Sequence, residues 1–429
     1  MDADVRIRVR LSVMMALVYT VQGAFWPVLA IHLTDLGISE RGRGAIFATM
    51  AIASFAMPLG AGQLVDRLLP TQRFLAASFG VGAILLGVIA AGVATSAASL
   101  FGLFLTYWLF MAPSYSLSNS LAFRNLQRPE RDYAGVRLWG TVGWMTVGLV
   151  VSGVMALNSP GGANPGRGAT EAFWIAAGFS LITALYCWTL PSTPPVRLVP
   201  GGRRSTVVRD VLDLVGRPGV AVYLASAFCF SLTTPYVYQV IPAYLRRLGM
   251  DRAWVASAMS LGQWPEVVGL ALLPALIRRW GYRWTLLLGV GAYVVRFGML
   301  AGVPSLWVAT VGIPLHGVGI ACFSIVGQMF INTQASADRR ASAQSINTVI
   351  NGGLGSLTGN LLAGEVVRGL PNQPGLVFLV PCLINLALVV FLVAKFRPAM
   401  TETKRSVGPE SKAVSVGSTR GEPLAAAAD

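Results

Sequence analysis

Long apolar stretches follow one another along the chain, and the polar residues gather mainly in the short segments between them. A helix needs about 20 mostly apolar residues to cross the hydrocarbon core of a bilayer. Twelve stretches have roughly this length, and they cover residues 11–32, 43–65, 73–93, 98–121, 134–157, 171–191, 218–244, 254–277, 283–303, 305–332, 340–366 and 374–396. The pattern therefore predicts an all-α integral membrane protein with twelve transmembrane helices.

A Pro- and Arg-rich segment, residues 192–217, separates the first six stretches from the last six. The third stretch contains FGVGAILLGVIAAG and the ninth contains LGVGAYVVRFGMLAG, which is a weak internal repeat. Two parallel repeats of six helices are one plan for transporters, with the substrate site between the halves. We expect an N-terminal half over 1–191, a central cytoplasmic loop over 192–217, a C-terminal half over 218–397 and a disordered cytoplasmic tail over 398–429.

The composition excludes a soluble protein, because 54% of the residues are hydrophobic and only 12% are charged. In a soluble chain, the net charge of +15 would suggest a nucleic-acid partner. Here most Lys and Arg lie in the N-terminal segment, the tail and alternate loops, so the positive-inside rule predicts that both termini are cytoplasmic. We expect a multi-pass protein of a bacterial inner membrane, surrounded by lipid and without a nucleic-acid partner. Three arginines in a loop expected outside run against this trend, and the pattern does not explain them: Arg246, Arg247 and Arg252.

Cysteine and histidine residues are few and scattered. The four cysteines all lie inside apolar stretches, without the spacing of a metal site or a disulfide framework: Cys187, Cys229, Cys322 and Cys382. The only histidines are His32 and His316. Because no His, Asp and Glu residues cluster, the sequence predicts no metal, no cofactor and no enzyme active site.

Glu266 is the one acidic side chain near the middle of an apolar stretch. A carboxylate is costly inside a membrane, so an acid at such a position is a candidate for function. Burial favours the neutral form of a carboxyl, which suits a group that takes up and releases a proton. Gln263 lies one helical turn earlier on the same face. We predict that Glu266 couples protons to transport and contacts the substrate, the alternative being a structural ion pair with Arg296.

The fifth stretch begins with VRLWGTVGW, which places Arg137, Thr141 and Trp144 at helical spacings of i, i+4 and i+7. These spacings put a guanidinium, a hydroxyl and an indole on one helix face. Such a face can hold a small polar solute that carries a ring, with hydrogen bonds at one edge and stacking on its plane. The alternative is an arginine at the membrane interface followed by packing residues.

The loop after the second stretch reads GQLVDR and resembles the loop 2–3 signature of the major facilitator superfamily. Gly62 would allow two helices to approach closely, and Asp66 would attract an arginine or the N-terminus of a neighbouring helix. We expect Gly62, Asp66 and Arg67 to latch one conformational state of a carrier. The alternative is an ordinary charged turn.

Several motifs together resemble those of the nucleoside:proton symporters of the major facilitator superfamily. They are VRLWGTVGW, the Gln263–Glu266 pair, VVRF around Arg296, LHG at 315–317 and RRASAQ at 339–344. The resemblance implies the major facilitator fold, with two parallel six-helix repeats. It also implies that a nucleoside contacts Arg137, Thr141, Trp144, Gln263 and Glu266, and that Glu266 helps to couple the proton.

The resemblance extends less evenly to the seventh and tenth stretches. His316 takes the place of an aromatic residue before glycine, and we expect it to contact the substrate. Pro235 and Tyr238 stand where the family can carry Gln and Asn, and Tyr238 is a further candidate for substrate binding. Ala321 stands where the family often has an acid, which leaves the exact substrate and the proton stoichiometry open.

We therefore predict a monomeric secondary transporter that imports nucleosides together with protons by alternating access. The same fold admits other cargo, either a sugar or another small polar metabolite, or a drug exported against protons. A sensor or membrane scaffold is a third alternative. It would need a signalling domain, for which the central loop and the tail are short.

Overall fold

The computed structural model describes residues 3–56, 70–158, 168–193, 215–335 and 340–397. Within these ranges the chain forms helices and turns and no strand, so the all-α class is confirmed there. The predicted latch (Gly62, Asp66 and Arg67), the tail and most of the central loop lie outside the described residues. The residues predicted to contact the substrate all lie within the described ranges.

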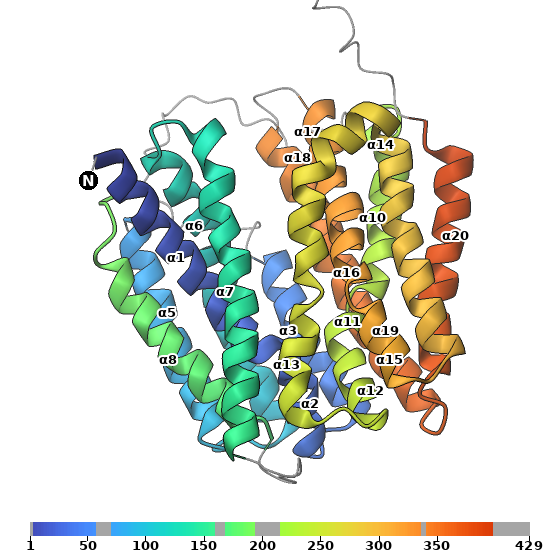
Figure 1. Ribbon diagram of the computed structural model, residues 1–429, viewed down its shortest axis with the longest axis horizontal. Helices are drawn as coiled ribbons and strands as arrows, with labels where there is room; N and C mark the ends of the chain where they lie inside the picture. Colours follow the sequence, from blue (N-terminus) through green and yellow to red (C-terminus); the bar gives the residue numbers. More distant parts are fainter. Residues whose placement is uncertain (1–2, 57–69, 159–167, 194–214, 336–339, 398–429) are drawn as a thin grey trace, which may run out of the picture. The chain divides into compact units, whose positions relative to one another are not determined.

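The N-terminal half is formed by α1 (Ala3–Phe25), η1 (Trp26–Val28), α2 (Leu29–Asp35), α3 (Glu40–Ala56), α5 (Thr71–Ala90), α6 (Ala97–Asn125), α7 (Pro129–Asn158) and α8 (Thr170–Cys187). The first segment is interrupted at Pro27, which lacks a backbone N–H, and continues through the 3-10 turn η1 into α2. Helix α1 packs against α7 and α8, α5 packs against α8, and α3 packs against α6. Figure 1 shows α1, α5, α7 and α8 grouped on one side.

The C-terminal half contains more and shorter elements. They are α10 (Val220–Thr233), α11 (Tyr236–Gln239), α12 (Ile241–Arg247), η3 (Arg252–Trp254), α13 (Val255–Ser260), α14 (Gln263–Gly302), α15 (Leu306–Gly312), α16 (Leu315–Gly319), η4 (Ile320–Ile325), α17 (Val326–Gln334), α18 (Arg340–Thr348), η5 (Val349–Gly355), α19 (Ser356–Gly369), η6 (Leu376–Phe378) and α20 (Leu379–Lys395). Two of them, η4 and η5, are π-helices, a geometry that is frequent at functional sites.

Nine helical segments among the described residues are long and apolar enough to cross a membrane. One of them, Arg252–Gly302, contains both the eighth and the ninth apolar stretch. The two are separated by a sharp bend at Gly281, where φ is 71° and only glycine turns without strain. The second apolar stretch runs from α3 into residues outside the described ranges.

The apolar core is divided into two clusters that follow the two halves. One cluster consists of residues between Leu11 and Leu190, with Ala253 and Ala256 added from the C-terminal half. The other consists of residues between Val220 and Phe396, with Ile31 added from the N-terminal half. The residues that cluster with the opposite half, Ala253, Ala256 and Ile31, mark the end of the bundle at which the halves pack together.

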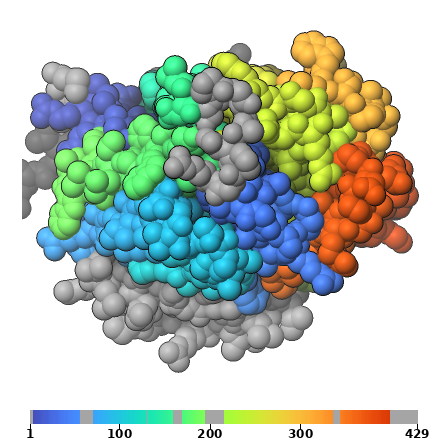
Figure 2. All heavy atoms as spheres, turned by 90° about the horizontal axis from the view of Figure 1, so that it is seen from below, coloured from blue at the N-terminus to red at the C-terminus, as the bar shows by residue number. Residues whose placement is uncertain are grey.

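At that end, α3 packs against α19, and α7 packs against η3 and α13. The hydroxyl groups of Ser152 and Ser257 are 2.7 Å apart across this contact. Arg41 of α3 forms an ion pair with Glu365 of α19. A space-filling view from this end shows the blue atoms of the N-terminal half against the yellow-green and red atoms of the C-terminal half (Figure 2).

Candidate functional site

Three helices of the C-terminal half are broken directly before a predicted site residue. The breaks lie at Thr234–Pro235 before α11, at Leu261–Gly262 before α14 and at Ile313–Pro314 before α16. Tyr238, Gln263 and His316 then lie in the first turn of the helix that follows each break. Irregular backbone inside a membrane is tolerated only where protein or a cavity surrounds it, so these breaks indicate an interior polar region.

The three side chains after the breaks interact with one another. Gln263 donates from Nε2 to the hydroxyl of Tyr238 over 3.4 Å. The Tyr238 ring lies edge-on to the His316 ring, with the ring centres 5.7 Å apart. Nδ1 of His316 and the hydroxyl of Tyr293, on α14, form a hydrogen bond of 2.8 Å. Tyr238, Gln263, Tyr293 and His316 therefore form one connected polar group, which we call the C-face.

The VRLWGTVGW motif lies on α7, which packs against α1. The Arg137 guanidinium lies 4.0 Å above the centre of the Tyr19 ring, which is a cation–π contact. Thr141 and Trp144 are buried, and Gly23 of α1 leaves room for the Trp144 ring. Because α1 and α7 pack closely, the guanidinium, the hydroxyl and the indole are held on a rigid surface.

The two halves meet through aromatic rings at Tyr238. The Trp144 ring of α7 contacts Tyr238 edge-on, with a centroid distance of 6.3 Å. Trp26 of η1 lies at the same distance from Tyr238. The structure thus brings Trp144 from the N-terminal half together with Tyr238, Gln263 and His316 from the C-terminal half, although these residues are far apart in sequence.

Glu266 lies on α14 one turn after Gln263, and its side chain is partly exposed. Among the described residues it forms no ion pair, and the expected alternative, a structural pair with Arg296, is wrong. Helix α14 contacts α7, the helix of Arg137, where the two halves meet. Gly317 of α16 lets the backbone of the first turn of α14 approach closely, which fixes the position of Glu266.

Arg296 is a buried residue near this group, and the sequence did not reveal its environment. Its side chain is 1% exposed, and Nη1 and Nη2 have no hydrogen-bond partner in the described part of the chain. Arg296 lies on α14 three residues after Tyr293, so it neighbours a member of the C-face on the same helix. A charged residue inside the ninth apolar stretch was the available signal, but the partners of that charge depend on tertiary packing.

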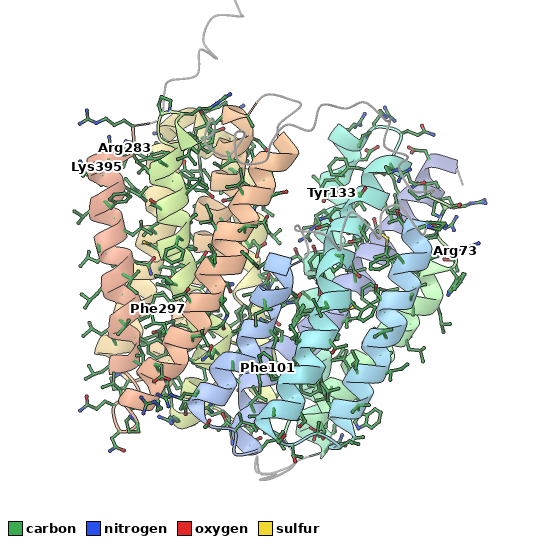
Figure 3. The ribbon with its side chains drawn as sticks, turned by 180° about the vertical axis from the view of Figure 1, so that it is seen from behind. Arg73, Phe101, Tyr133, Arg283, Phe297 and Lys395 are labelled. Carbon is green, nitrogen blue, oxygen red and sulfur yellow. The ribbon has the colours of Figure 1, made fainter. Side chains whose placement is uncertain are left out.

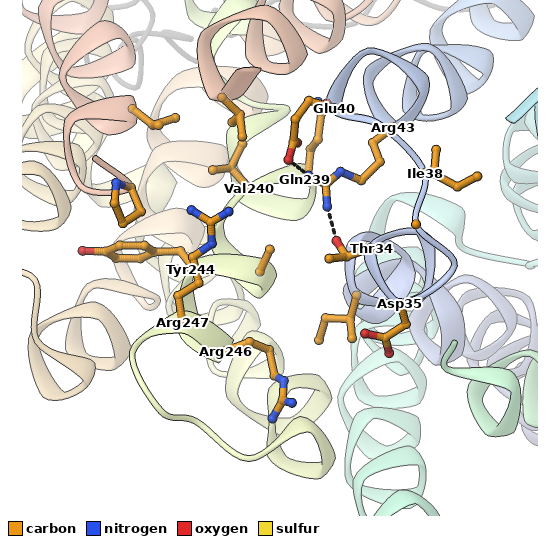
Figure 4. A pocket seen from close by; sticks show the side chains of 16 residues that line it. Thr34, Asp35, Ile38, Glu40, Arg43, Gln239, Val240, Tyr244, Arg246 and Arg247 are labelled. Atoms are coloured by element: carbon orange, nitrogen blue, oxygen red, sulfur yellow. Dashed lines mark hydrogen bonds and ion pairs between the residues drawn. The ribbon is translucent and has the colours of Figure 1, made fainter. Parts of the chain in front are cut away.

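A separate cavity of about 440 Å³ lies at the end where the halves pack together (Figure 4). Arg43 reaches into it, forms an ion pair with Glu40 and donates to the hydroxyl of Thr34. Gln239 and Arg247 line it from the other half. None of the predicted substrate-binding residues lines this cavity, so it is distinct from the group around Tyr238.

Within the described ranges, no group of three or more His, Cys, Asp and Glu side chains is placed to hold a metal ion. The four cysteines are free thiols. The side chains around Tyr238 offer hydrogen bonding and ring stacking, and the carboxyl of Glu266 can exchange a proton.

A membrane-spanning helical chain in which a carboxyl has no ion pair among the described residues where the two halves meet has the features of a secondary transporter. Residues 5–401 match the nucleoside H⁺ symporter family, and the chain belongs to that family. It is a proton-coupled nucleoside transporter and not an enzyme, so nucleosides take precedence over sugars and drugs as cargo.

Individual relatives agree with the family match. The putative nucleoside transporter YegT of Escherichia coli (strain K12) is 29% identical over 364 residues, which are 84% of each chain. The xanthosine permease of the same organism is 25% identical over 390 residues, covering 84% of this chain and 88% of the permease. The crystal structure of the nucleoside transporter NupG superimposes with a TM-score of 0.77 at 21% identity, over 92% of this chain and all of that chain. This likeness shows that the two proteins share their fold.

Proposed function

We propose that the nucleoside binds between the halves, in contact with residues from both. Its binding residues are Arg137, Thr141, Trp144, Tyr238, Gln263, Glu266 and His316. Arg137 and Gln263 hydrogen-bond the ribose or the base, and Trp144 packs on a ring. The observation that carries this proposal is the contact of Trp144 with Tyr238, which in turn is bonded to Gln263.

Glu266 carries the proton in this proposal. A charged carboxylate is costly to enclose in a dry site, so the site closes around the nucleoside only when Glu266 is protonated. After the carrier opens to the other side, Glu266 releases its proton.

We further propose twelve membrane spans in two parallel six-helix repeats, in a monomer of the inner membrane with both termini in the cytoplasm. Arg283 and Lys395 lie together at one end of the helices, as the positive-inside rule expects of the cytoplasmic end (Figure 3). The end closed by Asp35 and Arg252 would then face the outside. In that orientation the structure corresponds to a carrier that is closed to the outside.

Uptake of radiolabelled uridine into cells tests the proposal. The uridine concentration inside the cells should rise above the concentration outside. It should fall to the outside concentration when a protonophore collapses the proton gradient. The Glu266→Gln variant should bind uridine but lose concentrative uptake. Arg279→Met, which removes an exposed charge from the same helix, is the matched control and should transport normally. Full concentrative uptake by Glu266→Gln would remove the residue assignment, whereas uptake insensitive to the protonophore would remove proton coupling.

A further inference from the structure

His32 and Arg252 lie side by side at the closed end, and both are buried. Arg252, on η3 of the C-terminal half, is 2% exposed and reaches into the N-terminal half. Its Nε lies 3.4 Å from a carboxyl oxygen of Asp35, and its Nη2 lies 3.9 Å from one of Glu171. Nη2 also donates to the carbonyl oxygen of Gly168. One arginine of the C-terminal half is thus held by three groups of the N-terminal half.

The imidazole of His32 has no role in the proposed substrate site or in proton binding by Glu266. It is 1% exposed, and neither ring nitrogen has a hydrogen-bond partner among the described residues. The ring packs on Phe173 with a centroid distance of 4.5 Å, and Gly168, at a φ of 62°, leaves room for it. An unsatisfied buried polar group is costly and needs an explanation, such as a role in proton transfer.

A cavity connects His32 with the surface at this end of the molecule. Its volume is about 390 Å³, and its lining includes His32, Thr95, Thr170 and Trp174. Thr95 and Trp174 are exposed, so solvent reaches the far side of the cavity. Solution on this side therefore reaches the layer of side chains that contains His32, and Thr95 and Thr170 supply hydroxyl groups along the cavity.

The charged groups around His32 define what its protonation would change. Arg252 comes from η3, Glu171 from α8 and Asp35 from the helix of His32 itself, and the charge of Arg246 on α12 also acts on Asp35. Asp35 lies three residues after His32, so the two side chains are neighbours on the surface of α2. A protonated His32 would add a second cation next to Arg252 and an N–H donor for Asp35. It would therefore compete with Arg252 for the same carboxylate.

We propose that His32 is a second proton-binding site of the transporter, and that its protonation releases Arg252 and opens this end. The proton passes from solution to the imidazole, Asp35 exchanges Arg252 for His32, and the two halves separate. Burial beside Arg252 disfavours a charged imidazole in the closed structure, so protonation favours the open state, in which a solvated histidine changes charge between about pH 5 and 8. The proton that opens the carrier is thus distinct from the one that Glu266 carries. The proposal adds to nucleoside transport and does not depend on which nucleoside is carried.

The distance between two spin labels at this end tests the proposal without any substrate. Val93 and Asn372 are exposed, lie at the same end in different halves, and can be replaced by cysteine. The two half-buried native cysteines, Cys229 and Cys382, are replaced by serine. The Glu266→Gln background removes the other proton site. Between about pH 7.5 and about pH 5.5, the population with the longer distance should rise about threefold or more.

His32→Gln should abolish this rise, and Asp35→Asn should give the longer distance at both pH values because Arg252 has lost its main partner. Arg279→Met, which changes an exposed residue outside the proposed sites, should keep the rise. The proposal is overturned if His32→Gln still shows the rise or if the Glu266→Gln background shows none. If His32→Gln does not fold, the Asp35→Asn variant still tests the proposal. A short distance at both pH values in Asp35→Asn contradicts the release mechanism. None of these outcomes depends on uridine uptake, so a failure of the nucleoside site is detected separately.

Discussion

Replacing Arg296 by methionine should make the protein more stable and less active. The guanidinium is almost fully buried, and its two terminal nitrogens lack hydrogen-bond partners among the described residues. A buried charged group that is left unsatisfied costs about 1–3 kcal/mol or more. Methionine has a similar length and no charge, so Arg296→Met should raise the free energy of unfolding by about 1–3 kcal/mol. A cost of this size at a functional site is an example of stability given up for activity.

The loss of activity follows from the residues that Arg296 supports. It lies one helical turn after Tyr293, whose hydroxyl is hydrogen-bonded to His316, and both of these residues belong to the C-face. We expect uridine uptake to fall by about tenfold or more, which corresponds to about 1.4 kcal/mol. Thermal unfolding of the purified protein measures the first effect, and initial uptake rates normalised to protein in the membrane measure the second. Arg279→Met serves as the control, because Arg279 is exposed and should change neither quantity.

A destabilised Arg296→Met protein would refute this reasoning. It would mean that the guanidinium has an anionic partner in the folded protein, since removing one member of a buried ion pair is strongly destabilising. An Arg296→Met protein with normal uptake would contradict the functional part alone. The two measurements therefore separate the energetic argument from the functional one.

Three further predictions concern the site and the contact between the halves. Trp144→Ala should raise the KM for uridine by about tenfold, because it removes ring stacking, while Trp144→Phe should retain most of the affinity. A KM that is unchanged in the alanine variant would exclude Trp144 from the site. Gly317→Val should reduce uptake at least as strongly as Trp144→Ala, because even a Cβ at Gly317 meets the backbone of α14 beside Glu266. Normal transport by Gly317→Val would contradict this close packing. Glu365→Gln should leave uptake and thermal stability close to those of the unmodified protein, because the Arg41–Glu365 pair is exposed to solvent. A large loss of uptake or of thermal stability would show that this ion pair holds the carrier closed.

The helical class and the helical spacing of several predicted site residues could be derived from the sequence, because they depend on local periodicity. Apolar stretches of bilayer length indicated the helices. The i, i+4 and i+7 spacing indicated that Arg137, Thr141 and Trp144 share a helix, and the i, i+3 spacing did the same for Gln263 and Glu266. Such relations are fixed by the geometry of a single helix and need no knowledge of the fold.

Contacts between distant helices could not be predicted in this way. Tyr238 joins Trp144 and Gln263 only because the two halves pack against each other, and no spacing in the sequence encodes that arrangement. The same limit applies to Arg252, which ran against the distribution of positive charge. The structure explains it, because Arg252 is buried against Asp35, Glu171 and the carbonyl oxygen of Gly168 and is not a residue of an exposed loop.

Proton movement into proteoliposomes tests the role of Glu266 most directly. The purified protein is reconstituted with a pH-sensitive dye in the lumen, and uridine is added outside without an imposed gradient. The unmodified protein should acidify the lumen as uridine enters. The Glu266→Gln protein should exchange labelled for unlabelled uridine and leave the lumen pH unchanged. Acidification by Glu266→Gln that matches the unmodified protein would show that another group carries the transported proton.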